Sequence, residues 1–397
     1  MESLPLQSFL QSLHKEQWQE VRLGEVAEIV NGYAFKSKEF LNIQQRDSLP
    51  IIKIKNVANG DVNLNDVVFY PYSKQLEKFL IKYGDILVSL TGNHPQAQSQ
   101  VVGQISKYKY KQFALLNQRV AKIVTKDAEQ DFLYYLLKTN KIHNILASHS
   151  SGSANQANIS SKDIENLTIP LPPLTIQQKI AEILSSFDDK IDLLHRQNKT
   201  LESLALTLFR HYFIDNPKRD EWELGKLGDY IEIFDSKRIP LSKLQRDKMK
   251  TGNLYPYYGA ANIMDYVNDF IFNGEYILMG EDGSVETEDG YPILQFASGK
   301  FWVNNHAHIF KAKQPYNDFF ILNFLKSTNI SHIVTGAVQP KINQENLKSI
   351  PFPIFSQQLV RGFIETTNVC FDKINQNKKQ IQNLQAMRDM LLKAIFA

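Results

Sequence analysis

Two histidines one residue apart, His306 and His308, are the most obvious candidates for metal chemistry in this chain. Imidazole nitrogens are common ligands of zinc and other transition metals. The surrounding segment, KFWVNNHAHIF, is expected to be a strand, and it contains no cysteine and no adjacent carboxylate that would complete a ligand set. We therefore expect no metal here.

Signatures of cofactor-dependent catalysis are missing from the sequence. No glycine-rich cofactor loop follows a predicted strand, and no Walker pattern is present. The proline pair at residues 169–174, IPLPPL, lacks the preceding Asn or Asp with which amino-methyltransferases hold the target amino group. The sequence therefore predicts no catalytic residues and no cofactor.

Basic residues occupy corresponding loops, each just after the first predicted strand of one half of the chain. Lys36 and Lys38 lie in NGYAFKSKEF, and Lys237 and Arg238 lie in DSKRIP. Basic side chains neutralise DNA phosphates without reading sequence. Their recurrence at equivalent loops favours phosphate contacts over an ordinary charged surface.

A second basic segment, residues 106–111, alternates lysine and tyrosine. In a strand, Lys107, Lys109 and Lys111 would share one face and could contact phosphates. A solvated edge strand protected by charge explains the same pattern, and both interpretations remain open.

If the chain binds DNA, its bases would be read by polar loops, because Asn and Gln pair with adenine and Arg pairs with guanine. Each candidate competes with the simpler explanation of a solvated loop. The candidates are Asn93, Gln96, Gln98, Gln118, Arg119, Tyr257, Tyr258, Asn262, Glu281, Asp282 and Ser284.

The longest helical pattern covers residues 175–213. Its apolar residues follow steps of three and four, which is typical of a coiled-coil seam. The seam consists of Leu184, Phe187, Ile191, Leu194, Leu201, Ala205, Leu208 and Tyr212. Asn198 occupies its one polar position and is expected to set the register. Asp188, Arg196 and Lys199 belong to flanks that are expected to be solvated, where Arg196 and Lys199 are candidate contacts for partner proteins.

A second copy of this helix ends the sequence. FDDKI at residues 187–191 recurs as FDKI at residues 371–374, and apolar residues continue at Ile381, Leu384, Leu391 and Ile395. The first helix begins at the first half of the chain and ends at the second half, where the second helix begins. The second helix must therefore run back antiparallel to the first to bury its apolar stripe. At ~1.5 Å per residue, each helix is about 50 Å long and is interpreted as a spacer.

The rest of the chain is a tandem duplication. Four residues of the first half recur in the second at one offset: Trp18, Leu23, Gly24 and Ile29 correspond to Trp222, Leu227, Gly228 and Ile233. Strands are expected at residues 49–57, 84–92, 101–105 and 113–124, then at 274–283, 291–296 and 300–310; helices are expected at 131–149 and 318–327.

These elements predict an α+β protein with two mixed α/β domains in tandem. Two long antiparallel helices separate the domains as a coiled-coil-like spacer, and a pseudo-twofold axis relates the halves. The expected segments are an N-terminal amphipathic segment (1–17), domain 1 (18–170), helix 1 (171–215), domain 2 (216–353) and helix 2 (354–397). Duplicated readers at a fixed distance suit duplex DNA.

Composition sets further bounds. The chain has 397 residues, of which 43% are hydrophobic, and its single cysteine excludes an internal disulfide. The N-terminus lacks a secretory signal and no apolar run reaches the length of a membrane span, so a cytoplasmic protein is expected. A net charge of +3 means that any DNA-binding surface must be local.

The sequence resembles the specificity subunit of type I restriction-modification systems. The resemblance covers essentially the whole chain and includes the internal repeat. The motifs that carry it are IPLPPLTIQQKIAEIL at residues 169–184 with its FDDKI continuation, SGSANQANIS at 151–160, LNQRV at 116–120 and YPYYGA at 255–260. The second copy departs from the pattern, because FPIFSQQLVRGFI at residues 352–364 is degenerate around the proline pair.

The resemblance implies that both domains are target-recognition domains, each of which reads one half of a bipartite target in double-stranded DNA. The helices would set the gap and dock two modification subunits, which alone would bind S-adenosylmethionine and methylate adenine. Restriction subunits would complete the nuclease. The competing hypotheses are a self-sufficient enzyme, which the absent cofactor motifs disfavour, and a stand-alone DNA-binding protein or protein adaptor that is not coupled to methylation.

Overall fold

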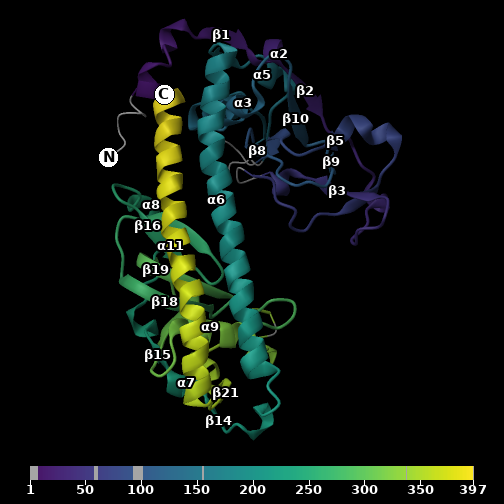
Figure 1. Cartoon of the computed structure of the whole chain (residues 1–397). Helices are drawn as coiled ribbons and strands as arrows, with labels where there is room; N and C mark the ends of the chain where they lie inside the picture. Colours follow the sequence, from purple (N-terminus) through teal and green to yellow (C-terminus); the bar gives the residue numbers. More distant parts are fainter. Residues whose placement is uncertain (1–7, 58–60, 93–101, 154–155, 337, 397) are drawn as a thin grey trace. The chain divides into compact units, whose positions relative to one another are not determined.

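The computed structural model describes residues 8–57, 61–92, 102–153, 156–336 and 338–396 (Figure 1). The chain divides into two compact units. Unit 1 consists of Met1–Asp192 and Ile381–Ala397, and unit 2 of Leu193–Gln380. Each unit combines sheets with helices, which confirms the α+β class. Among the described helices, none is long and apolar enough to cross a membrane.

Unit 1 contains two four-stranded sheets. The main sheet is antiparallel and has the order β2-β10-β6-β8. Its strands are β2 (Ala27–Asn31), β10 (Val120–Thr125), β6 (Ile86–Ser89) and β8 (Ile105–Lys107). The second sheet consists of β4 (Phe69–Pro71), β3 (Ser48–Ile52), β9 (Ala114–Leu116) and β5 (Leu80–Ile81), and β3 and β9 are parallel. Small sheets pair β1 (Gln19–Arg22) with β13 (Thr168–Leu171), and β11 (Ser151–Ser153) with β12 (Gln156–Asn158) and β7 (Thr91–Gly92).

Unit 2 contains one six-stranded sheet with the order β15-β20-β18-β19-β16-β17. Its strands are β15 (Ile231–Ile233), β20 (Ala307–Ala312), β18 (Phe272–Gly280), β19 (Leu294–Val303), β16 (Tyr255–Tyr258) and β17 (Ile263–Val267). A separate pair joins β14 (Leu224–Lys226) to β21 (Pro351–Pro353).

The strand orders confirm the internal repeat. The order β2-β10-β6-β8 in unit 1 matches β15-β20-β18-β19 in unit 2, and the pair β1-β13 matches β14-β21. The parallel pair β3-β9 matches the parallel pair β16-β19. The long hairpin of β18 and β19 thus takes the place of two shorter pairs in unit 1, β6-β8 and β5-β9.

Two predicted elements of unit 1 are each divided. The strand expected at residues 113–124 forms β9 and β10, which belong to different sheets because residues 117–119 turn the chain. The helix expected at residues 131–149 forms α3 (Gln130–Leu137) and α4 (Asn140–Ser148). Thr139 breaks it, because its extended backbone and side-chain oxygen cap the N-terminus of α4. The helix expected at residues 318–327 is confirmed as α9 (Asp318–Lys326).

The most apolar helix of each unit lies entirely inside its core. Residues 132–137 of α3 are all buried, as are residues 319–325 of α9. A helix that is hydrophobic on every side needs cover on every side. The long helices supply it: residues of α6 (Leu174–Phe209) and α11 (Gln357–Phe396) belong to the same core cluster as α3 in unit 1 and as α9 in unit 2.

The long helices pair antiparallel within unit 2. Asn377 Nδ2 donates to Asn198 Oδ1 at 2.8 Å, and further along the pair the ring of Phe209 contacts that of Phe363. Both asparagines are buried. Because their hydrogen bond is made only when the two positions face each other, the prediction that Asn198 sets the register is supported.

Two predictions for the seam are wrong. Asp188, expected on a solvated flank, is buried in unit 1 and faces Arg388 of α11. Tyr212, expected on the seam, is exposed. The helix passes into a π turn at Arg210–Ile214, so Phe209 and Phe213 enter the core in its place.

The Asp188–Arg388 contact is a buried ion pair. Arg388 Nη1 lies 2.7 Å from Asp188 Oδ1, and the Tyr135 hydroxyl donates to Oδ2 at 2.9 Å. Burial acts to raise the pKa of Asp188, but the hydrogen bond and charge of Arg388 and the Tyr135 hydroxyl outweigh it, and the pKa lies below 3.8. The carboxylate therefore stays ionised inside the seam.

Asp188→Asn is expected to destabilise the protein by about 3 kcal/mol at pH 7, because it leaves the largely buried Arg388 charge with only the exposed carboxylate of Asp389 as a partner. A lowered carboxyl pKa contributes stability that is complete above pH 3.8 and is lost as pH falls through the folded-state pKa. The gap between variant and wild type should therefore shrink in acid, as measured by denaturant unfolding. Asp189→Asn, on the exposed neighbour, is the control and should change stability by less than ~0.5 kcal/mol. Equal stability of wild type and Asp188→Asn at pH 7 would contradict the assignment.

Candidate nucleic-acid interface

In unit 1, three segments converge at one end of the main sheet. The Leu90 N–H donates to Arg119 O at 2.9 Å, and the Ile159 N–H donates to Leu90 O at 3.0 Å. These bonds join the end of β6, the turn at residues 117–119 and the segment after β12. Since both are backbone hydrogen bonds, the framework does not depend on the side chains that it presents.

Unit 2 repeats this framework. The Glu281 N–H donates to His306 O at 2.8 Å, and the Ile342 N–H donates to Glu281 O at 2.8 Å. Leu90, Arg119 and Ile159 of unit 1 therefore correspond to Glu281, His306 and Ile342 of unit 2. The two units present the same loop scaffold with different side chains.

The structure places four predicted residues of unit 1 on two adjoining segments. The loop after β2 starts against the turn at 117–119, where the Gln118 N–H donates to Tyr33 O at 2.9 Å. Gly32 permits the approach, because a Cβ there would lie 2.0 Å from Asn117 O. Lys36, Lys38, Gln118 and Arg119 are among the exposed side chains of these two segments.

The alternating lysines do not form one basic face. β8 ends at Lys107, so the predicted strand through residue 111 is wrong. Lys107 Nζ lies 2.6 Å from Asp131 Oδ1, and Lys109 Nζ lies 3.0 Å from Asp61 Oδ2. Carboxylates thus neutralise both, and only Lys111 is fully exposed. The structure favours a structural role for Lys107 and Lys109.

The predicted residues of unit 2 are divided between surface and core. Lys237, Asn262 and Ser284 are exposed. Tyr257 is 1% exposed, and its hydroxyl accepts the Leu241 N–H at 3.0 Å, so its geometry assigns it to packing. Tyr258 is partly buried against Phe301. Asn93, Gln96 and Gln98 lie outside the described residues.

The sequence did not identify Asn305 and His306 as candidates for base reading, although they correspond to Gln118 and Arg119. The signal was present, because LNQRV and VNNHA share an asparagine at positions 117 and 304 before the turn. Asn305 is exposed and His306 is partly exposed beside Asp282. Lys341, from the loop before α10 (Gln344–Ser349), is also exposed at this end of unit 2.

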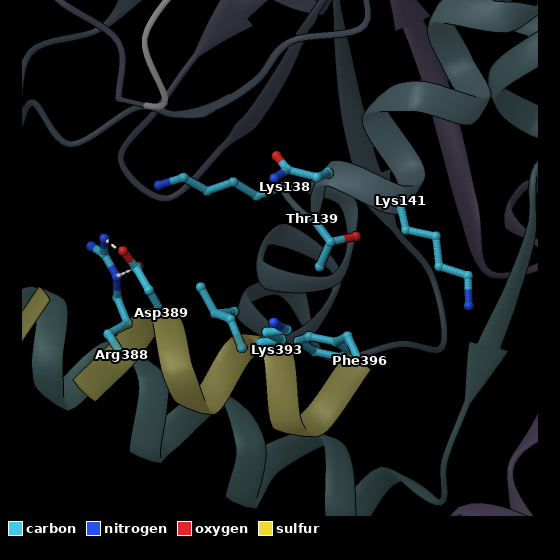
Figure 2. Close-up of a pocket in the computed structure, with 9 residues that line it drawn as sticks. Lys138, Thr139, Lys141, Arg388, Asp389, Lys393 and Phe396 are labelled. Atoms are coloured by element: carbon cyan, nitrogen blue, oxygen red, sulfur yellow. Dashed lines mark hydrogen bonds and ion pairs between the residues drawn. The ribbon is translucent and has the colours of Figure 1, made fainter. Parts of the chain in front are cut away.

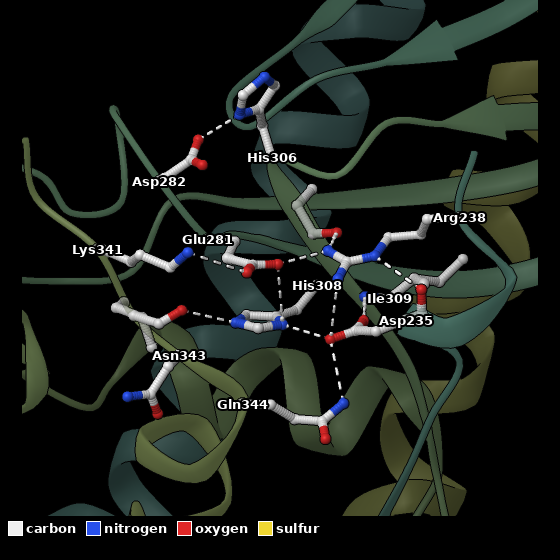
Figure 3. Close-up of polar contacts among 12 residues, drawn as sticks. Asp235, Arg238, Glu281, Asp282, His306, His308, Ile309, Lys341, Asn343 and Gln344 are labelled. Carbon is white, nitrogen blue, oxygen red and sulfur yellow. Dashed lines mark hydrogen bonds and ion pairs between the residues drawn. The ribbon is translucent and has the colours of Figure 1, made fainter. Parts of the chain in front are cut away.

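His308 lies in a charged cluster that the sequence did not predict (Figure 3). Its Nδ1 is 2.6 Å from Asp235 Oδ2 and 3.6 Å from Glu281 Oε2. The segment around the histidines contains no carboxylate, but folding brings Asp235 and Glu281 to His308 from loops distant in sequence.

The three side chains place ligand atoms within 4.8 Å of one another, as a metal site would. Arg238, however, occupies this cluster as its cation. Its Nη1 lies 2.5 Å from Glu281 Oε2, and its Nη2 lies 3.5 Å from Asp235 Oδ2. The guanidinium already balances the carboxylates where a metal ion would bind. The cluster therefore joins loops, and we expect no metal.

A basic pocket of about 610 Å³ lies in unit 1 between α4 and the C-terminal part of α11 (Figure 2). Lys138, Lys141, Arg388 and Lys393 line it, with Asp389 as the single acid. Burial lowers the pKa of Lys138, with a further contribution from nearby Arg388. The excess positive charge suits an anionic group. Sequence reasoning missed this pocket because its cations come from segments about 250 residues apart.

Comparison with known proteins assigns the family. A model of the type I restriction modification DNA specificity domain matches residues 15–203 and 219–383. The chain is 25% identical over 391 residues to the type I restriction enzyme MjaIX specificity subunit of Methanocaldococcus jannaschii, covering 87% of this chain and 88% of that protein. It is 24% identical over 416 residues to the putative MjaX specificity subunit of the same organism, covering 93% and 92%.

The fold agrees with this assignment. A crystal structure of the type I restriction-modification S subunit from M. genitalium has a TM-score of 0.55 and 18% identity, with 96% of each chain covered. The two regions matched by the family model include most of the sequence and follow one another in tandem. The chain therefore belongs to the type I restriction-modification DNA specificity family.

Proposed function

We propose that each unit reads one half of a bipartite DNA target, and that the chain acts as the noncatalytic specificity subunit of a type I restriction-modification complex. The observation that carries this proposal is the repeated loop framework with unlike side chains. Where unit 1 presents Gln118 and Arg119, unit 2 presents Asn305 and His306. A common scaffold with different polar tips is what reading two different half-sites requires.

The exposed side chains suit both tasks of DNA recognition. Lys36, Lys38 and Lys237 can neutralise phosphates and so fix the protein on the duplex. Gln118 and Arg119 have the donors and acceptors that pair with adenine and guanine edges in the major groove. The relatives' names, which describe specificity subunits of restriction enzymes, support this reading.

Methylation would be carried out by partner subunits. We propose that two modification subunits bind S-adenosylmethionine and dock on the long helices, and that restriction subunits join them. The outer faces with Arg196 and Lys199 and the basic pocket of unit 1 are candidate surfaces for these contacts. A cytoplasmic location follows from this function, because the DNA to be methylated is there.

Mapping methylated adenines with and without this gene, in cells that carry the modification subunit, tests the proposal. A bipartite methylated motif should appear only when the gene is present. Purified chain alone should not bind labelled S-adenosylmethionine. DNA binding without any effect on methylation would instead indicate a stand-alone DNA-binding protein, and no DNA binding would indicate an adaptor.

Lys36→Ala and Lys38→Ala should each reduce the salt dependence of DNA binding. Every phosphate contact contributes about −0.9 to the slope of log K against log salt, so each variant should lose roughly one unit of slope. The bases preferred by unit 1 should not change. Salt titrations of an electrophoretic shift measure the slope, with exposed Lys190→Ala on α6 as the matched control. An unchanged slope in both loop variants would remove these lysines from the interface.

A further inference from the structure

His308 joins segments of unit 2 through both ring nitrogens. It is 0% exposed on β20, with Nδ1 2.6 Å from Asp235 Oδ2 and Nε2 2.8 Å from Ile342 O. A carbonyl oxygen only accepts hydrogen bonds, and so does an ionised carboxylate. Neutral imidazole has one N–H, so the two bonds form together only when the ring is a protonated imidazolium.

Asp235 is the ionised partner that this argument needs. Burial acts to raise its pKa, but the hydrogen bond and charge of His308, the Ile309 N–H and Arg238 outweigh burial and lower it. Asp235 Oδ1 accepts the Ile309 N–H at 2.9 Å, and Gln344 Nε2 donates to Oδ2 at 3.3 Å. Three donors therefore hold the carboxylate, namely His308, the Ile309 N–H and Gln344, with the charge of Arg238 beside them.

The cluster extends to each loop of the candidate interface (Figure 3). Asp235 and Arg238 belong to the loop after β15, Glu281 follows β18, and Lys341 and Ile342 precede α10. Arg238 Nη1 donates to Ala307 O at 2.7 Å as well as to Glu281, and Lys341 Nζ lies 3.6 Å from Glu281 Oε1. Without a proton on His308, either the Asp235 or the Ile342 bond loses its donor.

Unit 1 lacks this device. The pair Ile29↔Ile123 of strands β2 and β10 is equivalent to the pair Ile233↔Phe310 of strands β15 and β20. Two residues away along these strands, Asn31 therefore corresponds to Asp235, and Ala121 corresponds to His308. In unit 1 the Ser161 hydroxyl donates to Asn31 Oδ1 at 2.7 Å, a neutral contact. The same scaffold therefore holds its loops through a neutral hydrogen bond in unit 1 and through the charged ring of His308 in unit 2.

We propose that His308 is a positioning residue for DNA reading by unit 2. Its protonated ring ties the loop after β15 to the segment before α10, and unit 2 reads its half-site only while the Asp235–His308–Ile342 bridge is intact. The inference rests on the proposed function, because it concerns how the same loops are held.

Two variants separate the arms of the bridge. His308→Gln keeps a donor near Nε2, for Ile342 O, and removes the one that faces Asp235. Asp235→Asn removes the charge at nearly constant shape and installs the residue type found at position 31 of unit 1. Both variants should retain the fold, which melting of the purified chain checks, and both should loosen the same loops.

The experiment selects DNA from random-sequence duplexes with the full chain bound to its modification subunit. Wild type should enrich two half-motifs, and Arg119→Ala identifies the one read by unit 1. In His308→Gln and Asp235→Asn, enrichment of the other half-motif should fall by at least about tenfold, the discrimination supplied by one well-read base. The unit 1 half-motif should stay unchanged and serves as the internal control.

Selective loss of one half-motif is a readout that a role in global stability would not produce. Loss of the bridge should weaken reading by unit 2 while reading by unit 1 persists. The charged groups that face His308 are Asp235, Arg238 and Glu281, with Lys341 beside Glu281.

The outcomes distinguish the inference from the function on which it rests. If wild type enriches no bipartite motif, the proposed function fails. If wild type enriches one and both variants keep both half-motifs, the inference about His308 is overturned and the function stands. Loss of both half-motifs together with a large fall in melting temperature would also overturn it, because the bridge would then serve global stability.

Discussion

Exchanging residues 222–353 for the equivalent domain of another specificity subunit is expected to replace one half of the methylated sequence and leave the other half unchanged. The exchanged segment closes on itself, because β14 near its start pairs with β21 at its end, with Leu224 opposite Pro353. It carries its own sheet, its own loop framework and the whole His308 cluster.

The change in specificity should be large, because each mismatched base pair costs roughly 1–3 kcal/mol of binding free energy. A foreign second domain should therefore no longer select the half-site that the original domain read. Contributions of the two units should add, since each unit carries its own loop framework. Methylome sequencing of the chimera measures the outcome. A chimera that carries the same segment from a close relative with the same target is the control. A change in both half-sites would show that the halves are not read independently.

Matched insertions in both long helices are expected to lengthen the recognised gap. Asn198 faces Asn377 in an antiparallel pair, so seven residues added after Lys199 should be matched by seven after Asn375. Seven residues add about 10.5 Å and return the apolar stripe to within roughly 20°. If the helices set the spacing, the gap should grow by about three base pairs at ~3.4 Å per step.

The same insertion in α6 alone should fail for a structural reason. It displaces the Asn198 side of the seam relative to α11 and buries polar residues against apolar ones, at a cost of several kcal/mol. Loss of thermal stability should accompany loss of DNA binding in that variant. Methylome sequencing of the doubly extended protein reads the gap directly, and an unchanged gap in a stable protein would exclude the helices as the ruler.

The sequence determined the repeat, the two long helices and the polar seam position. These features depend on local or periodic patterns: the recurrence of Trp18 and Trp222 at the start of each half, the steps of three and four, and one asparagine in an apolar stripe. Such patterns survive without knowledge of distant contacts, because the period of a helix is a property of its own backbone. The buried Asn198–Asn377 contact agrees with the pattern.

The tertiary structure alone decided which charged residues are structural. Asp188 has the sequence context of a solvated flank, and only Arg388, 200 residues away, makes its burial possible. His308 has no carboxylate nearby in sequence, yet Asp235 and Glu281 meet it across loops that strand pairing brings together. Exposed polar loops and charge clusters that hold loops have the same composition, and they differ only in partners that chain folding supplies over long sequence separations.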